Sequence, residues 1–166
     1  MSQWIDLSMH WERITHLDRE RQEQKKHYKS GLHLSKQSTW LIGLAGEYAV
    51  SALCGQSVDE ALKPCGDSGI DFRCDFGTVD VKSSTRLSNA DLVLFPDQKH
   101  WADYYILVSV DVAKKRARVC GWATLAEIRE GELHDYGYGL RLRLKEDALH
   151  RGIVPSMEFF NEVQRM

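Results

Sequence analysis

Residues 66 to 84 organise the rest of the chain, and they read Gly66-Asp67-Ser68-Gly69-Ile70-Asp71-Phe72-Arg73-Cys74-Asp75-Phe76-Gly77-Thr78-Val79-Asp80-Val81-Lys82-Ser83-Ser84. Apolar and polar residues alternate from Ile70 to Cys74 and again from Val79 to Ser83, which is the pattern of a half-buried strand. The residues between the two runs include Gly77, which permits a tight turn. The stretch therefore predicts a β-hairpin with one apolar face and one polar face.

The polar face of this predicted hairpin carries two aspartates and a lysine. A tight turn places Asp71 directly opposite Asp80 or Lys82, and directly opposed Cβ atoms are roughly 4.5–5.5 Å apart. Two carboxylates this close repel each other unless a cation lies between them, and Mg²⁺ takes oxygen ligands of this kind. Lys82 shares the face of Asp80 because side chains alternate along a strand. Such a group suits metal-assisted attack of water on a phosphodiester.

These residues resemble the motif of the PD-(D/E)xK nuclease superfamily. The match consists of Gly69-Ile70-Asp71 followed by Asp80-Val81-Lys82, with an acidic residue, Glu47, on a preceding helix. Ile70 stands where the proline that names the family would be, as it does in many members. The resemblance covers residues 38 to 125 as an order of elements. It implies an α/β fold with a restriction-endonuclease-like core, in which helices flank a mixed four- to five-stranded sheet on both faces in the order α-β-β-β-α-β.

The resemblance also implies a role for each motif residue. Glu47, Asp71 and Asp80 would hold Mg²⁺ or Mn²⁺, together with the backbone carbonyl of Val81. Lys82 would position the hydrolytic water or neutralise charge in the transition state. The implied substrate is DNA, and nothing in these residues excludes RNA.

The helix expected to carry Glu47 runs from about residue 38 to about residue 53, with Gly55 after its end. Gly43 and Gly46 neighbour Glu47, and such small residues would let the helix approach the sheet closely and bring the Glu47 carboxylate near Asp71. Without the downstream motif, Glu47 would be interpreted as an ordinary exposed glutamate. The motif favours a place in the site.

Polar and basic groups after the hairpin offer further contacts. Ser84, Thr85 and Arg86 follow the strand that carries Lys82, and they are either phosphate contacts or a strand end that enters a loop. Residues 87 to 101 are expected to be that loop, with Trp101 either an anchor on the core or a stacking partner for a base. Residues 140 to 145 alternate leucine with basic residues, which indicates an edge strand or a phosphate-contacting stripe.

The second half of the chain predicts more of the sheet. The run from Tyr104 to Val112 is nearly continuously apolar, as in a central strand covered on both faces. Residues 116 to 123 form another expected strand. Thr124 and Glu127 then have the spacing of a capping box at the start of a short helix.

The start of the chain predicts an added helix. Apolar residues recur at helical spacing from Trp4 to Ile14, and charged residues dominate from residue 18 to residue 29. We therefore expect residues 1 to 31 to form an amphipathic and then charged helix that packs on a nuclease-like domain of residues 32 to 166. A homodimer contact and a phosphate contact through the basic residues of this helix stay open as alternatives.

Composition limits the classes of protein. The chain has 166 residues, which fits one domain, and its formal net charge of −2 gives no overall basic surface for nucleic acid. The four cysteines form no Cys-x-x-Cys pair, so we interpret them as reduced thiols. No apolar run approaches the length of a membrane span, and the first residues lack the pattern of a secretion signal. We expect a cytoplasmic protein with no membrane partner.

Three functions remain open at this point. The leading hypothesis is a metal-dependent nuclease. The second is a non-catalytic module of the same fold that binds nucleic acid or protein. The third is an assembly protein, built through the N-terminal helix, in which Asp71, Asp80 and Lys82 make only a cross-strand salt bridge of about 0–1 kcal/mol.

Overall fold

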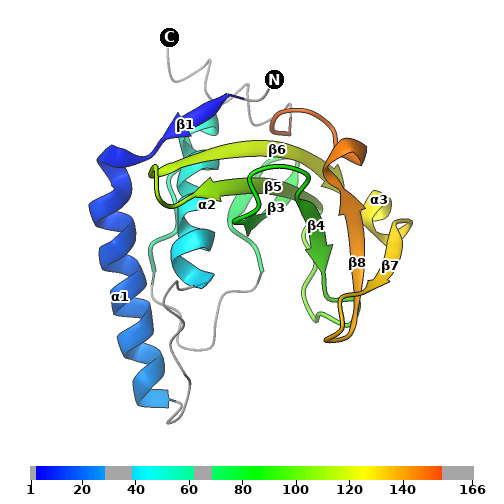
Figure 1. The fold of residues 1–166 in the computed structure, drawn as a ribbon, viewed down its shortest axis with the longest axis horizontal. Helices are drawn as coiled ribbons and strands as arrows, with labels where there is room; N and C mark the ends of the chain where they lie inside the picture. Colours follow the sequence, from blue (N-terminus) through cyan, green and yellow to red (C-terminus); the bar gives the residue numbers. More distant parts are fainter. Residues whose placement is uncertain (1–2, 29–38, 62–68, 155–166) are drawn as a thin grey trace.

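The computed structural model describes residues 3–28, 39–61 and 69–154. Figure 1 shows the arrangement of the described elements. In chain order they are β1 (Trp4–Asp6), the 3-10 helix η1 (Ser8–His10), α1 (Trp11–Tyr28), α2 (Thr39–Cys54), β2 (Phe72–Cys74), β3 (Gly77–Ser84), β4 (Asp91–Leu94), β5 (Tyr104–Asp111), β6 (Arg116–Thr124), α3 (Leu125–Arg129), β7 (Glu132–Asp135), β8 (Leu140–Lys145) and the 3-10 helix η2 (Glu146–Ala148).

The larger of two sheets is mixed and has five strands in the order β1-β6-β5-β3-β2. β3 and β5 are parallel, and the other neighbours in this sheet are antiparallel. The apolar run of residues 105 to 110 is buried along its whole length in β5, as expected for a strand covered on both faces. The structure therefore confirms an α/β fold with a mixed sheet.

One face of this sheet is covered by α1 and α2, which lie side by side on the left of Figure 1. Their apolar residues make one core with the inward side chains of the sheet, among them Leu7, Ile14, Leu17, Leu44, Ala45, Ala49, Val79, Val81, Ile106 and Val108. α2 carries this packing because its buried residues are small or aliphatic. Gly55 follows the helix with a φ of 76°, which confirms the predicted end of α2.

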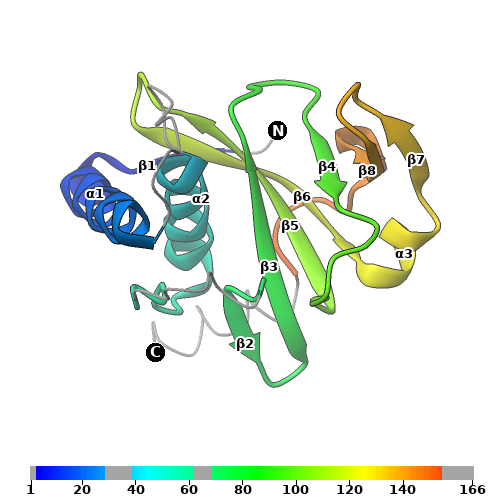
Figure 2. The same cartoon turned by 90° about the horizontal axis from the view of Figure 1, so that it is seen from below.

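The opposite face is covered differently from the prediction of helices on both faces. A second, antiparallel sheet of order β4-β8-β7 packs there together with the short helix α3. Figure 2 shows β3 running between α2 on one side and β4 and β8 on the other. The second core contains Ala90, Leu92, Leu94, Ala102, Tyr105, Leu107, Ala123, Ile128, Leu142 and Leu149.

Three predictions about this second layer were wrong. Residues 87–101 were expected to be a loop, yet they contain β4. Residues 140–145 do form a strand, but it is central because β4 and β7 pair on its two sides. The predicted core order α-β-β-β-α-β also fails among the described residues. Four strands of the large sheet follow α2 before α3, and the strands after α3 join the small sheet.

The N-terminal prediction was also wrong in part. Trp4 to Asp6 form a strand rather than the first turns of a helix, and α1 begins only at Trp11. The reason is a contact with a strand far along the chain. β1 pairs with β6, and the Trp4 ring lies 4.2 Å from the guanidinium of Arg116 and 5.9 Å from that of Arg118.

No helix in the described part of the chain is long and apolar enough to cross a membrane.

Candidate metal centre

The site is built on the β2–β3 hairpin, which the structure confirms as antiparallel. Phe72 pairs with Val79 and Cys74 pairs with Gly77 across a two-residue turn. β2 is shorter than the predicted strand, but the backbone N–H of Asp71 still donates to the carbonyl of Val79 at 2.9 Å. Asp71 therefore stands directly before the start of β2, where the edge of β3 beyond Val79 becomes open.

The Asp71 side chain occupies this open edge. Its Oδ2 accepts a hydrogen bond of 2.7 Å from the backbone N–H of Val81. The N–H and carbonyl of one strand residue point to the same side, and residues two apart point alike. The Val81 carbonyl therefore faces the same edge as the Asp71 carboxylate, which is the place that the resemblance implies for a metal ligand.

Asp80 and Lys82 lie on the adjacent part of β3. Asp80 is only 3% exposed. The Lys82 ammonium lies 2.7 Å from Asp80 Oδ2, and the Lys82 side chain keeps 35% of its surface exposed. The pair thus joins a buried carboxylate to a cation that solvent can still reach.

The helix that carries Glu47, α2, packs unusually closely on β3. A Cβ atom added at Gly46 would lie 1.9 Å from Ser83 Oγ and 3.4 Å from Val81 Cγ1, whereas one at Gly43 would meet nothing within 4 Å. Gly46 is therefore the residue that permits the close approach, and Gly43 is not. The half-buried Glu47 follows Gly46 directly, and its charge acts on Asp71.

The electrostatics of the site show how crowded its carboxylates are. Burial raises the pKa of Asp71 well above its usual value, and the charges of Glu47 and Asp80 raise it further. A hydrogen bond from a protonated Asp71 to Asp80 acts in the same direction, while the Val81 N–H opposes it. Burial alone would lower the pKa of Lys82, but the charges of Asp80 and Asp71 outweigh it, so this pKa is raised.

The donors suit a hard divalent cation, but they are not assembled as a ligand shell. The site offers three carboxylates and one backbone carbonyl as oxygen ligands. A bound Mg²⁺ or Mn²⁺ would relieve the repulsion between the carboxylates. Across the described ranges, however, no three His, Cys, Asp or Glu side chains converge as a metal-binding group. One Asp80 oxygen is occupied by Lys82.

One residue of the site escaped sequence reasoning. Tyr105 lies beside Asp80 in the register of β3 with β5, and it is fully buried. Its hydroxyl accepts a 2.9 Å hydrogen bond from the N–H of Ala102. Burial raises the pKa of Tyr105, and the charge of Asp80 adds to this. The parallel pairing of β3 with β5 was the missing signal, because it cannot be predicted from either strand alone.

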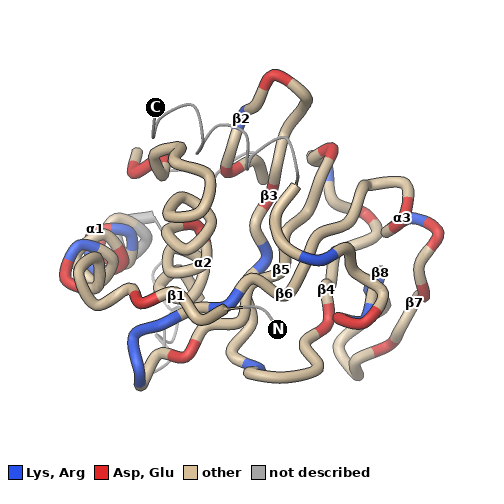
Figure 3. The backbone as a smooth tube through the Cα atoms, turned by 90° about the horizontal axis from the view of Figure 1, so that it is seen from above, with Lys and Arg blue, Asp and Glu red and all other residues tan. Residues whose placement is uncertain are grey.

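The predicted nucleic-acid contacts follow Asp80 and Lys82 along the chain, at the end of β3 and directly after it. Ser84 is the last residue of β3, Thr85 and Arg86 are exposed, and the N–H of Arg86 donates to Ser84 Oγ at 3.1 Å. Figure 3 shows acidic and basic residues interspersed along the chain, as on α1, which carries both.

Trp101 was predicted to be either an anchor on the core or a stacking partner for a base. It packs on the second core, and the guanidinium of Arg129 lies 5.0 Å from its ring, which favours the anchor interpretation.

Comparisons of this chain with protein-family models, with curated proteins and with solved structures found no match.

Proposed function

We propose that this protein is a metal-dependent nuclease that hydrolyses phosphodiester bonds, with DNA as the substrate. The single observation that carries the proposal is the arrangement of acids at the open edge of β3. Asp71 accepts a hydrogen bond from the Val81 N–H, and the buried Asp80 pairs with Lys82 on the same strand. The charges of Glu47 and Asp80 both act on Asp71. A fold gains nothing in stability from a carboxylate such as Asp71, whose charged form is disfavoured by burial and by two further acids. Such an arrangement is typical of a functional site that binds a cation.

The neighbouring lysine supports catalysis rather than simple metal storage. A bound Mg²⁺ or Mn²⁺ would polarise the phosphate and lower the pKa of a coordinated water. Glu47, Asp71 and Asp80 would hold it, with the Val81 carbonyl at the same edge. Lys82 is held by Asp80 at 2.7 Å and remains partly exposed, so its ammonium can orient the attacking water or neutralise charge that develops on the phosphate.

The restriction-endonuclease-like core is part of the same proposal. One support is the order α2, β2, β3, because Glu47 lies on α2, Asp71 directly before β2 and Asp80 on β3. The other is the mixed sheet, in which β3 and β5 are parallel. The strands after α3 depart from the family's order because they build the second sheet.

A non-catalytic binding module on the same fold is the second candidate. The observation that favours it is the Lys82–Asp80 ion pair, which occupies an oxygen that a cation would need. The two candidates differ in a measurable way, because only the nuclease must bind Mn²⁺ through Asp80 and cleave a polynucleotide.

The test is a cleavage assay on linear, circular, single-stranded and branched DNA, and on RNA, with Mg²⁺, Mn²⁺ or EDTA. The proposal predicts cleavage that requires the cation and that is absent from the Asp80→Asn variant. Asp75→Asn is the matched control, because Asp75 is an exposed residue of the hairpin turn. Mn²⁺ titration calorimetry on the same three proteins separates loss of binding from loss of chemistry.

A further inference from the structure

The outer face of the small sheet carries a group of rings that the catalytic proposal does not use. Leu92, Leu94 and Leu142 point into the second core. In the pairing of β4 with β8, Val93 faces Arg143, and in the pairing of β7 with β8, His134 faces Arg141. Because side chains alternate along a strand, these residues lie on the opposite, outer face.

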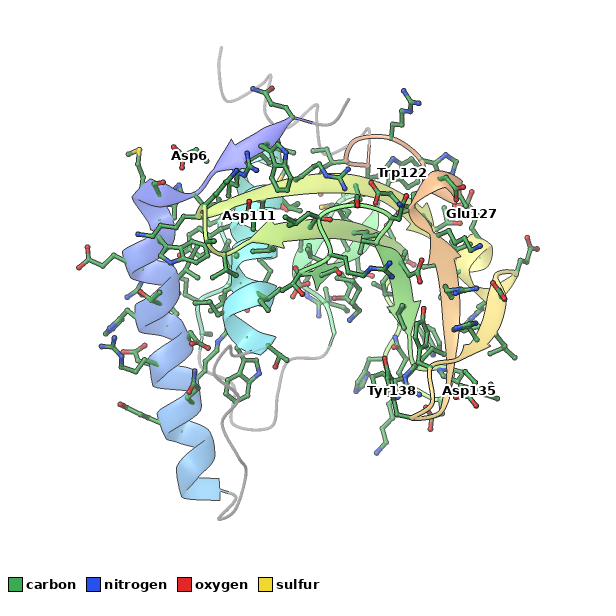
Figure 4. All side chains as sticks on the ribbon, viewed as in Figure 1. Asp6, Asp111, Trp122, Glu127, Asp135 and Tyr138 are labelled. Atoms are coloured by element: carbon green, nitrogen blue, oxygen red, sulfur yellow. The ribbon has the colours of Figure 1, made fainter. Side chains whose placement is uncertain are left out.

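The rings gather at the free end of this sheet, where Figure 4 labels Tyr138. Phe95 is 55% exposed and Tyr138 is 71% exposed. The guanidinium of Arg141 lies 4.0 Å from the centroid of Phe95 and 5.3 Å from that of Tyr138. Tyr136 and Tyr138 are stacked with centroids 5.9 Å apart and ring planes at 20°. We call Phe95, Tyr136, Tyr138 and Arg141 the aromatic platform.

The turn between β7 and β8 presents Tyr138 outward. Gly137 and Gly139 flank it with φ values of 85° and 114°, which side chains rarely adopt. A Cβ atom at Gly137 would meet nothing within 4 Å. The N–H of Gly137 donates to Asp135 Oδ1 at 2.8 Å, which ties the turn to the end of β7. A large ring on such a turn is available to an external partner.

The positive charge of Arg141 favours an anionic partner. Arg143 is neutralised, because it lies 2.6 Å from Glu132 and 3.8 Å from Asp91. Arg141 differs. Its contacts are the two rings and the carbonyl of Leu140, and no carboxylate of the described residues pairs with it. An arginine whose guanidinium lies over aromatic rings, with its charge unneutralised, can stack on a base and attract a phosphate at once.

We propose that the aromatic platform binds unpaired bases of single-stranded nucleic acid, with Arg141 contacting the adjacent phosphate. The inference rests on the proposed nuclease function for the identity of the polymer, and it narrows the substrate class to one with a single-stranded segment. Exposed aromatic rings on a sheet face stack on bases of any sequence, because every base has a π face. A duplex hides those faces, so it would bind more weakly.

The experiment measures binding without cleavage. Fluorescence anisotropy in EDTA follows a labelled oligothymidylate added to the Asp80→Asn protein, which keeps the platform intact. Tyr138→Ala should raise Kd about fivefold or more, since base stacking is typically worth about 1–3 kcal/mol per base. Tyr138→Phe should retain binding, and Arg141→Ala should reduce the slope of log Kd against log salt by roughly 0.7. Met9→Ala, at a residue 94% exposed on η1, is the control.

Each outcome of these measurements supports or overturns the proposal. Equal Kd values for Tyr138→Ala, Arg141→Ala and their parent, or no binding by the parent, overturn the proposal. So does a dimer by light scattering that Tyr138→Ala dissociates, because the platform would then bind a second copy. If the wild type cleaves DNA while platform variants bind and cleave normally, only this inference fails. If the platform binds oligothymidylate but the wild type never cleaves, only the nuclease proposal fails.

Discussion

Lys82 Nζ lies 2.7 Å from Oδ2 of Asp80, a carboxylate whose side chain is only 5% exposed. Surface ion pairs typically contribute about 0–1 kcal/mol, but this pair has one buried partner and two further acids nearby. Removing the lysine leaves the buried Asp80 carboxylate without its cation, unless a metal replaces it. The pair therefore couples the chemistry of Lys82 to the binding of metal.

Lys82→Ala should separate these two roles. The variant loses a competing positive charge and no metal ligand, so Mn²⁺ should bind as tightly as in the wild type or more tightly in a calorimetric titration. Cleavage should fall by about 10²–10³-fold, the usual effect of removing a positioned donor. Lys114→Ala, in the exposed turn before β6, is the control and should change neither quantity. Full cleavage activity in Lys82→Ala would remove Lys82 from the mechanism.

Asp71→Asn should stabilise the metal-free protein while abolishing cleavage. The amide oxygen can still accept from the Val81 N–H, and the repulsion from Glu47 and Asp80 is lost. The pKa of Asp71 is raised in the folded protein, so the folded state keeps this proton to higher pH than the unfolded state. Its stabilising contribution is present below the unfolded pKa and is lost as pH rises through the folded pKa.

Urea unfolding in EDTA at a series of pH values measures this effect. The wild type should lose free energy of unfolding across that window, and Asp71→Asn should lose less. A variant that is less stable than the wild type at neutral pH would show that the Asp71 carboxylate is a structural group rather than a strained one.

Gly46→Ala should damage both stability and cleavage, since it forces α2 away from β3. The new Cβ would collide with Ser83, and overpacking costs about 1–3 kcal/mol, more than the gain of about 0.5–1 kcal/mol in helix propensity. Gly43→Ala is the matched control on the same helix, and it should keep that gain. Thermal unfolding with a parallel cleavage assay compares the two variants.

Ser83→Ala tests the cause of that damage. Ser83 Oγ is buried, and within the described ranges it has no hydrogen-bond partner, so its removal alone should be neutral or stabilising. Combined with Gly46→Ala it should recover part of the lost stability, because the nearest clashing atom is gone. An additive double variant in the same thermal-unfolding measurement would mean that the contact is not the cause.

Tyr105→Phe should lower stability with little effect on Mn²⁺ affinity. The change leaves the Ala102 N–H without the hydroxyl that accepts its hydrogen bond, a loss of about 1–3 kcal/mol for a buried group. Urea unfolding and calorimetry measure the two quantities. A large loss of Mn²⁺ affinity would instead make Tyr105 part of the support of Asp80.

The sequence predicted the elements whose patterns are local. Alternation around Gly77 predicted the hairpin, the apolar run predicted β5, and the spacing of Thr124 and Glu127 predicted the capping box, in which the Thr124 N–H donates to Glu127 Oε2 at 2.8 Å. Small residues before Glu47 predicted a close approach of α2, although only Gly46 makes it. These features follow from neighbours in sequence.

The rest depends on partners far along the chain. Trp4 to Asp6 fit a helical spacing, yet β6 recruits them as a strand. β7 is only four residues long and shows no clear period, and it becomes a strand by pairing with β8. β4 did carry a local signal, because Leu92, Val93 and Leu94 form an apolar run between turn residues, and the prediction of a loop overlooked it. Tyr105 lies in the site because the register of β3 with β5 places it beside Asp80. Pairing of this kind leaves no local signal.

The most direct test of the central claim is the Mn²⁺-dependent cleavage of DNA by the wild type and by Asp80→Asn, purified in parallel. The claim is that the acids at the open edge of β3 hold a catalytic cation. It predicts cleavage by the wild type that EDTA abolishes and that Asp80→Asn lacks, with Asp75→Asn fully active. Absence of cleavage by the wild type on every DNA and RNA substrate, or equal cleavage by Asp80→Asn, would contradict it.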